Sequence, residues 1–116
     1  MKIKFISAGN RQISEIVSKE VLIKNVQDAL DLIGDADSDY IILHDYNFEK
    51  DFFDLSTGKL GEVLQKFTTY YKKLAIIGNF DIYPSKTLKD FIYESNKHGA
   101  YLFVKSIEEV IKKWQD

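Results

Sequence analysis

Two kinds of hydrophobic pattern divide the chain into predicted elements. Residues 2–7 and 12–18 are rich in β-branched side chains and predict two strands. Residues 8–11 between them, Ala-Gly-Asn-Arg, predict a hairpin turn because Gly and Asn tolerate positive φ. Later segments are short, continuous apolar runs, which indicate strands covered on both faces, as in a parallel sheet. These runs are residues 40–44, 74–78 and 100–104.

Between and after these runs, apolar residues recur every three or four positions, which predicts amphipathic helices. Asn25 is a candidate N-cap for the first helix, which we expect to end at Gly34. Ser106 and Glu109 have the spacing of a capping box at the start of the last helix. The apolar helical faces fall within residues 26–33, 60–71, 88–95 and 107–114.

The predicted order of elements is ββαβαβαβα. Strands that alternate with helices form right-handed crossovers onto a mostly parallel sheet, and the N-terminal hairpin adds an antiparallel edge. We therefore predict an α/β fold with about five strands and four helices. The length of 116 residues suits one domain. Because there is one proline and no linker-like stretch, we expect that domain to comprise residues 1–116.

Composition narrows the classes of function. The net charge is −2, and no run of Lys and Arg is longer than a pair, so we expect no nucleic-acid partner. The absence of cysteine excludes disulfides, thiolate metal sites and thiol nucleophiles, and fits a reducing compartment. No segment has the character of a signal peptide or membrane span, so we expect a cytoplasmic protein without a membrane partner. No Walker-type loop is present, and we expect no cofactor.

Hydroxyl groups and glycines gather at the predicted start of the second helix. Ser56 and Thr57 precede Gly58 and Lys59. One interpretation is a helix N-cap, which contributes about 1 kcal/mol. Another is a phosphorylation site, where a phosphate would meet free backbone amides and would place negative charge beside Asp54. The two interpretations are compatible, because an exposed cap hydroxyl can also be modified. Gly58 and Gly61, three residues apart on the predicted helix, predict close packing of the helix against the sheet.

The order of elements and this turn resemble the STAS domain, the anti-sigma-factor-antagonist fold. In that family a strand ending in Asp leads to a D-S-S-G turn that opens the second helix. Here residues 41–45, Ile-Ile-Leu-His-Asp, are followed by residues 54–58, Asp-Leu-Ser-Thr-Gly, with Leu55 as an extra residue. The resemblance implies that Ser56 or Thr57 accepts a phosphate from a partner kinase and that phosphorylation switches partner binding.

From about residue 25 to the C-terminus the chain is also similar to an uncharacterised bacterial family, domain of unknown function 4180. This resemblance implies membership of a family without an assigned activity. The matching stretches are residues 28–33, 42–44, 51–55, 57–58, 61–62, 64–67, 74–78, 85–86 and 90–94.

Polar residues follow the predicted parallel strands. His44 and Asp45 end the first of these strands, Asp81 follows the second and Lys105 follows the third. Ligands of open α/β sheets bind outside the carboxyl ends of strands, so these side chains could converge on one rim. Such a rim is similar to the Mg²⁺-binding phosphoacceptor site of receiver domains, although the acidic pair of those domains is missing here. The other interpretation makes His44 a structural, hydrogen-bonded residue.

Aromatic residues lie in predicted loops at the same end of the sheet. Phe52, Phe53, Phe80 and Tyr83 either pack beneath these loops or form an exposed patch for a protein partner. With Asp54 and Lys59 they make up the candidate partner surface.

The leading hypothesis is a non-enzymatic protein-interaction or regulatory module. It would bind a protein partner through residues 45–64 and be switched at Ser56 or Thr57. The alternative is a small metal- or phosphate-dependent enzyme or ligand binder that uses the rim of His44, Asp45, Asp81 and Lys105. The sequence is compatible with a homodimer but does not choose an oligomeric state.

Overall fold

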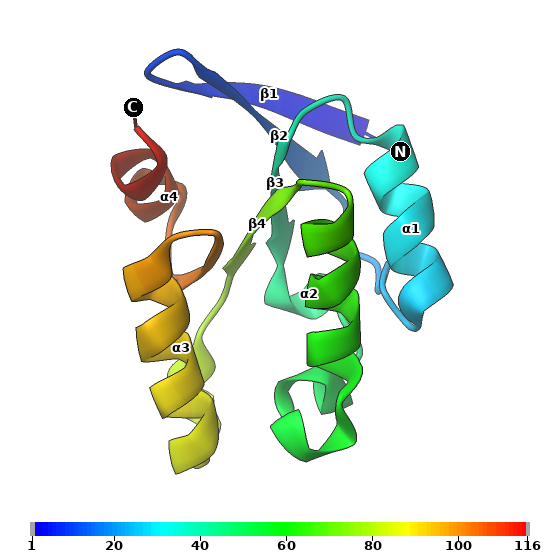
Figure 1. Ribbon diagram of the computed structural model, residues 1–116, viewed down its shortest axis with the longest axis vertical. Coiled ribbons are helices and arrows are strands. Elements are labelled where there is room, and N and C mark those ends of the chain that lie inside the picture. Colours follow the sequence, from blue (N-terminus) through cyan, green and yellow to red (C-terminus); the bar gives the residue numbers. More distant parts are fainter. Residues whose placement is uncertain (1, 116) are drawn as a thin grey trace.

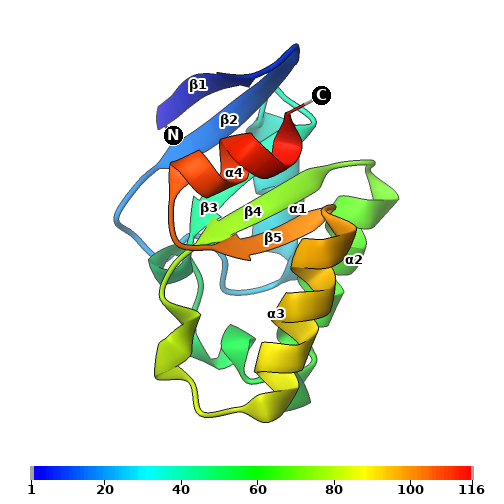
Figure 2. The same cartoon turned by 90° about the vertical axis from the view of Figure 1, so that its left-hand side faces the viewer.

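The strands of the computed structural model, which describes residues 2–115, lie side by side in the order in which they occur in the chain (Figures 1 and 2). Within these residues β1 pairs antiparallel with β2, and the following strands continue the sheet in parallel. This arrangement confirms the predicted α/β fold with five strands and one antiparallel edge. The strands are β1 (Lys2–Ala8), β2 (Arg11–Val17), β3 (Tyr40–His44), β4 (Lys73–Ile77) and β5 (Tyr101–Val104).

The hairpin between β1 and β2 is closed by a two-residue turn. Ala8 lies opposite Arg11, so only Gly9 and Asn10 form the loop. Gly9 has φ of +62°, a left-handed conformation that is rare for other residues and is required at the first position of a type II′ turn. The predicted turn is therefore confirmed.

Helices cover the two faces of the sheet unequally (Figure 2). Each right-handed crossover from β2 to β5 steps in the same direction, so the three crossover helices lie on one face. The helix after β5 returns across the other face, where its Val110 and Trp114 pack on Ile42, Ala75 and Leu102. In the described part of the chain the four α-helices are α1 (Val26–Asp35), α2 (Lys59–Thr69), α3 (Lys86–His98) and α4 (Ile107–Trp114).

The predicted caps Asn25 and Ser106 are present, and Ser85 caps α3 in the same way. The side chains of Asn25, Ser85 and Ser106 each accept a hydrogen bond from the backbone N–H three residues later. Gly99 ends α3 with φ of +94°. One detail of the predicted capping box is different, because the Glu109 side chain accepts from the N–H of Lys105 at 2.9 Å. Glu109 thus reaches past the cap to the end of β5.

Gly58 and Gly61 depart from the sequence-based expectation. Gly58 precedes α2 as its N-cap with φ of +76°, so it contributes conformation rather than a capping side chain. Gly61 lies in α2, but no atom outside the neighbouring backbone lies within 4 Å of the position that a Cβ would occupy. The prediction that Gly61 permits close packing against the sheet is therefore wrong.

Candidate functional site at the carboxyl ends of the strands

Short 3₁₀ turns gather at the carboxyl ends of the parallel strands, at the lower end of Figure 1. The sequence indicated only loops here. The turns place the predicted rim, the Ser-Thr turn and the loop aromatics at one end of the molecule. They are η1 (Asp45–Asn47), η2 (Lys50–Phe53), η3 (Leu55–Thr57) and η4 (Phe80–Ile82).

His44 is held by its neighbours at the end of β3. Its Nε2 lies 3.2 Å from Oε2 of Glu15 on β2, and its ring stacks on Tyr46 with centroids 5.0 Å apart. Only 19% of the His44 side chain and 11% of the Glu15 side chain are exposed. These contacts favour the interpretation of His44 as a structural, hydrogen-bonded residue.

Asp45 turns toward the end of β4. Its Oδ2 accepts a bond from the N–H of Asn79 at 3.4 Å. The carboxylate fills the space beside Gly78, where a Cβ would overlap it. Burial, and secondarily the charge of Asp45, raise the pKa of the Tyr83 hydroxyl. Asp45 is therefore part of the packing between the β3 and β4 ends.

Asp81 and Lys105 form an ion pair at the ends of β4 and β5. Lys105 Nζ lies 2.8 Å from Asp81 Oδ2, and both side chains are exposed. The hydrogen bond from Lys105, followed by its positive charge, lowers the pKa of Asp81, and the same contact raises the pKa of Lys105. Asn79 supports this loop, since its side chain accepts from the N–H of Asp81 at 3.2 Å.

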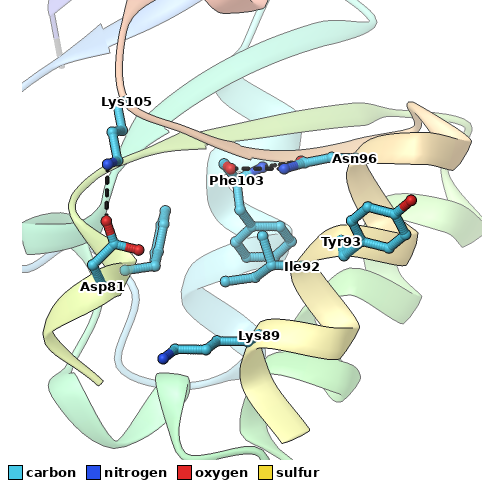
Figure 3. A pocket seen from close by; sticks show the side chains of 8 residues that line it. Asp81, Lys89, Ile92, Tyr93, Asn96, Phe103 and Lys105 are labelled. Carbon is cyan, nitrogen blue, oxygen red and sulfur yellow. Dashed lines mark hydrogen bonds and ion pairs between the residues drawn. The ribbon is translucent and has the colours of Figure 1, made fainter. Parts of the chain in front are cut away.

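A pocket of about 280 Å³ opens beside this ion pair, between η4, β5 and α3 (Figure 3). Its base is apolar and consists of Phe80, Ile92 and Phe103. In Figure 3, Lys105 and Asp81 stand on one side of the pocket, and Lys89 comes from α3. The pocket thus combines an apolar base with three charged side chains at its opening, those of Asp81, Lys89 and Lys105.

The contribution of α3 to this pocket is absent from the sequence-based prediction. Lys89, Ile92, Tyr93 and Asn96 lie at i, i+3, i+4 and i+7, so they share one face of the helix. The apolar stripe of this helix was expected from the sequence, whereas its contribution to a pocket was not. The polar face beside that stripe could have indicated the pocket, because it ends at Asn96, close to the start of the predicted strand 100–104.

The Ser-Thr turn lies immediately before α2. Ser56 is exposed, and its Oγ donates to Asp54 Oδ1 at 2.6 Å. This bond is the largest of the effects that lower the pKa of Asp54. The Thr57 hydroxyl donates to the Asp54 carbonyl at 3.0 Å and accepts from the N–H of Lys59 at 3.2 Å. Thr57 is therefore bound to the backbone at the helix start, whereas Ser56 is bound to a surface carboxylate.

Lys59 is paired across the same turn. Its Nζ lies 2.5 Å from Asp51 Oδ2, and this hydrogen bond raises the pKa of Lys59. The three acidic and basic side chains of the turn, Asp51, Asp54 and Lys59, are thus all engaged in hydrogen bonds.

The phenylalanines of the candidate partner surface are buried. Phe52, Phe53 and Phe80 are 1%, 2% and 8% exposed. The ring of Phe53 lies 5.4 Å from that of Phe80 and 5.7 Å from that of Tyr83. The hypothesis that these three phenylalanines form an exposed patch is corrected, because they pack in the core beneath the 3₁₀ turns. The exposed apolar side chains at this end are Tyr46 and Ile82 instead.

A family model described as Domain of unknown function (DUF4180) matches residues 8–114. The chain belongs to this family. Searches of curated proteins and of solved structures each gave no match. In the part of the DUF4180 chain that the structure describes, no helix has the length and apolar character needed to cross a membrane.

The rim residues do not assemble into a metal centre. Among residues 2–115, no three His, Asp or Glu side chains lie together as metal ligands would. His44 faces Glu15, Asp45 faces Gly78 and Asn79, and Asp81 faces Lys105. The four predicted rim residues therefore form three separate contacts rather than one site.

Asn47 organises this end of the DUF4180 chain and was missed by the sequence analysis. It is completely buried, and its side chain donates to the carbonyls of Ser18 and Glu20 while accepting from the N–H of His44. Its backbone carbonyl accepts from Leu22 and Ile23. One asparagine thus joins the segment after β2 to the end of β3. No periodicity marks such a residue, because its role depends on contacts with a distant segment.

Proposed function

We propose that the DUF4180 chain is a non-enzymatic regulatory module that binds a protein partner through the turns at the carboxyl ends of the strands. Phosphorylation of Ser56 would switch this binding. The observation that carries the proposal is the exposed Ser56 hydroxyl, which is fixed by Asp54 directly before an 11-residue helix. The order of elements and the turn at residues 54–58 support the likeness to STAS antagonists. The proposal keeps the cytoplasmic location that the composition predicts.

A phosphate on Ser56 would change the turn in two ways. The esterified oxygen could no longer donate a hydrogen bond to Asp54. The phosphate would also add nearly two negative charges beside Asp54 and near Asp51. Lys59 is already paired with Asp51, so phosphorylation would redistribute these contacts. Ser56 is the preferred acceptor over Thr57, because the Thr57 hydroxyl is used in backbone hydrogen bonds.

The proposed partner surface consists of exposed side chains of the turns at the carboxyl ends of the strands. Ile82 and Tyr46 are 66% and 48% exposed, and Leu55 and Tyr83 are partly exposed while also packing against the core. Side chains anchored in this way present apolar area at a small entropic cost. We therefore assign recognition to Tyr46, Leu55, Ile82 and Tyr83 rather than to the buried phenylalanines.

The decisive experiment combines phosphopeptide mass spectrometry with partner capture. Protein isolated from its native cells should carry phosphate on Ser56, and a protein captured by the wild-type chain should be lost with Ile82→Ser and with Ser56→Asp. Tyr70→Ser is the matched control, because Tyr70 is 52% exposed but lies at the other end of α2. Capture that survives both changes, together with unmodified Ser56 at full peptide coverage, would refute the proposal.

A second candidate function is binding of a small organic anion in the pocket of Figure 3. The specific observation is that Lys105 and Lys89 line the pocket on either side of the apolar base of Ile92 and Phe103 (Figure 3). An anion with an apolar body would place its charge at the lysines and would compete with Asp81 for Lys105. This candidate replaces the rim enzyme, for which the contacts of His44 and Asp45 give no support.

Thermal unfolding with benzoate and with inorganic phosphate tests this second candidate. Benzoate should raise the unfolding temperature more than phosphate does, because only benzoate can use the apolar base. Lys89→Met should abolish the shift. Lys66→Met, on the neighbouring helix α2, is the matched control and should retain it. An equal shift with both anions, or no shift with either, would contradict an anion site of this kind.

A further inference from the structure

The outer edge of β5 is closed by side chains of the flanking helices. Ser95 donates to the carbonyl of Tyr101 at 2.5 Å, and the Asn96 side chain donates to the carbonyl of Phe103 and accepts from its N–H. Glu109 accepts from the N–H of Lys105. These bonds occupy both outward backbone groups of Phe103, the carbonyl of Tyr101 and the N–H of Lys105, so an added strand would have to displace them.

The outer edge of β1 is different. In an antiparallel pair, alternate residues exchange hydrogen bonds with the neighbouring strand. The two-residue turn makes Ala8–Arg11 the first bonded pair, so Ile3, Phe5 and Ser7 direct their N–H and C=O groups away from β2. Outside the β1–β2 ladder, no hydrogen bond joins these groups to another segment of residues 2–115. Both overall views show β1 as the outermost strand (Figures 1 and 2).

We infer that β1 is a dimerisation strand that pairs antiparallel with β1 of a second copy of this chain. The symmetric register that uses all three outward residues is centred on Phe5. In this register Phe5 pairs with Phe5 of the second copy, and Ile3 pairs with Ser7 of the second copy. Each pair exchanges two backbone hydrogen bonds. The two five-stranded sheets become one continuous sheet.

The side chains of β1 favour this register for a second copy of the chain. In the register centred on Phe5, Lys4 lies opposite Ile6 and Lys2 lies opposite Ala8, so no lysine faces another. A register centred on Ile3 would set Lys2 against Lys4, and a parallel pairing would align the lysines of the two strands, both of which bring like charges together. The Phe5 side chain, 52% exposed in the single chain, meets its symmetry mate on the same face of the sheet.

The contrast between the two edges also fixes the size of the assembly. Of the two edge strands in residues 2–115, β1 is the one open to a further strand, because side chains of Ser95, Asn96 and Glu109 bond the outer edge of β5. An interface in which the same strand pairs with itself forms a closed two-fold dimer and cannot extend into a filament. The dimer leaves the turns at the carboxyl ends of the strands outside the interface, so it is independent of the proposed function.

The mass of the intact chain in solution tests the dimer. Light scattering after gel filtration, at loading concentrations from about 1 μM to about 1 mM, should show the mass of two chains at the upper end. Phe5→Pro should give a monomer at every concentration. The N–H of Phe5 points outward, and proline is tolerated at such edge positions, so the circular dichroism spectrum should stay unchanged. Phe5→Thr retains the N–H and should retain the dimer, with weaker association.

The register is tested by cross-linking, because the wild-type chain contains no cysteine. Phe5→Cys should form a disulfide-linked dimer with oxidised glutathione, since the two positions face each other. Ser7→Cys should not, since its opposite residue is Ile3. A wild-type chain that is monomeric at all concentrations, a Phe5→Pro variant that remains dimeric, or preferential cross-linking of Ser7→Cys would each overturn the inference. A monomer whose β1 captures an extended peptide from another protein would also overturn it.

Discussion

Asp45 and Gly78 show how one residue can be fixed by another that is distant in the chain. The Asp45 carboxylate occupies the space in which a side chain at position 78 would begin. Gly78 has no positive φ, so the requirement for glycine arises from this close approach and not from the backbone conformation. The carboxyl ends of β3 and β4 can therefore pack together because the Asp45 carboxylate fits against a residue that has no side chain.

Gly78→Ala should destabilise the fold, and Gly61→Ala should not. A Cβ at position 78 forces Asp45 to move, and overpacking of this kind costs about 1–3 kcal/mol. Gly61 has open space and lies within α2, where alanine is preferred by about 1 kcal/mol. Urea unfolding of both variants measures the two free energies. Similar changes of the same sign in both would contradict the packing described for Gly78.

The Ser56–Asp54 bond should make the effect of Ser56→Ala depend on pH. The bond lowers the pKa of Asp54 below its ordinary value of 3.8, so its contribution to stability is present above that value. The contribution is lost as pH falls through the lowered pKa of the folded state. Wild type should exceed Ser56→Ala in stability at pH 7, and the difference should shrink at acid pH. Urea unfolding at several pH values measures it. Asp54→Asn should remove the pH dependence of the difference.

At the scale of elements, Asn96 connects a helix to a strand. The predicted helix 88–95 lies within α3 (Lys86–His98), and the predicted strand 100–104 corresponds to β5 (Tyr101–Val104). The sequence did not indicate that the polar side of this helix would bond the outer edge of β5. The bond depends on the position of α3 beside β5, which the crossover sets and the periodicity of α3 does not contain.

Asn96→Ala should weaken the end of the sheet. It leaves both the N–H and the C=O of Phe103 without their partner, and an unsatisfied buried group costs about 1–3 kcal/mol. Hydrogen exchange of the Phe103 amide should accelerate, and the free energy of unfolding should fall. Lys97→Ala, on the next residue of α3, is the control, since its side chain is exposed. Unchanged protection of the Phe103 amide would show that Asn96 does not close this edge.

The crossover helices were predictable because hydrophobic periodicity records which side of a helix is buried. The parallel strands were predictable because continuous apolar runs indicate strands covered on both faces. The turns at the carboxyl ends were not. Phe52 and Phe53 interrupt a polar stretch without any period, and their burial depends on contact with Phe48 and Phe80 from other segments. Ser56 and Thr57 were identified by composition, but their different hydrogen-bond partners required the folded turn. The predicted rim of His44, Asp45, Asp81 and Lys105 was based on strand order. Strand order brings the ends of strands together but does not determine the directions of their side chains.

At the scale of the whole molecule, the sheet separates two unequal cores. Three helices cover one face, whereas α4 alone packs on the other (Figure 2). Trp114 links α4 to two distant segments. Its Nε1 donates a hydrogen bond to the carbonyl of Gly99 at 2.8 Å, and its backbone carbonyl accepts one from the Arg11 side chain. Its ring also contacts Tyr40 on β3. α4 is therefore linked to the hairpin, the middle of the sheet and the end of α3.

These links predict that α4 unfolds together with the rest of the domain. Trp114 is the only tryptophan and is 2% exposed, so its fluorescence reports the docking of α4. In urea, fluorescence and far-ultraviolet circular dichroism should change over the same concentration range, as expected for one cooperative transition. Arg11→Met removes the bond to the Trp114 carbonyl and should shift both curves equally. A fluorescence change that precedes the loss of helix and sheet would show that α4 undocks first, and that the second face contributes little to the cooperativity of the fold.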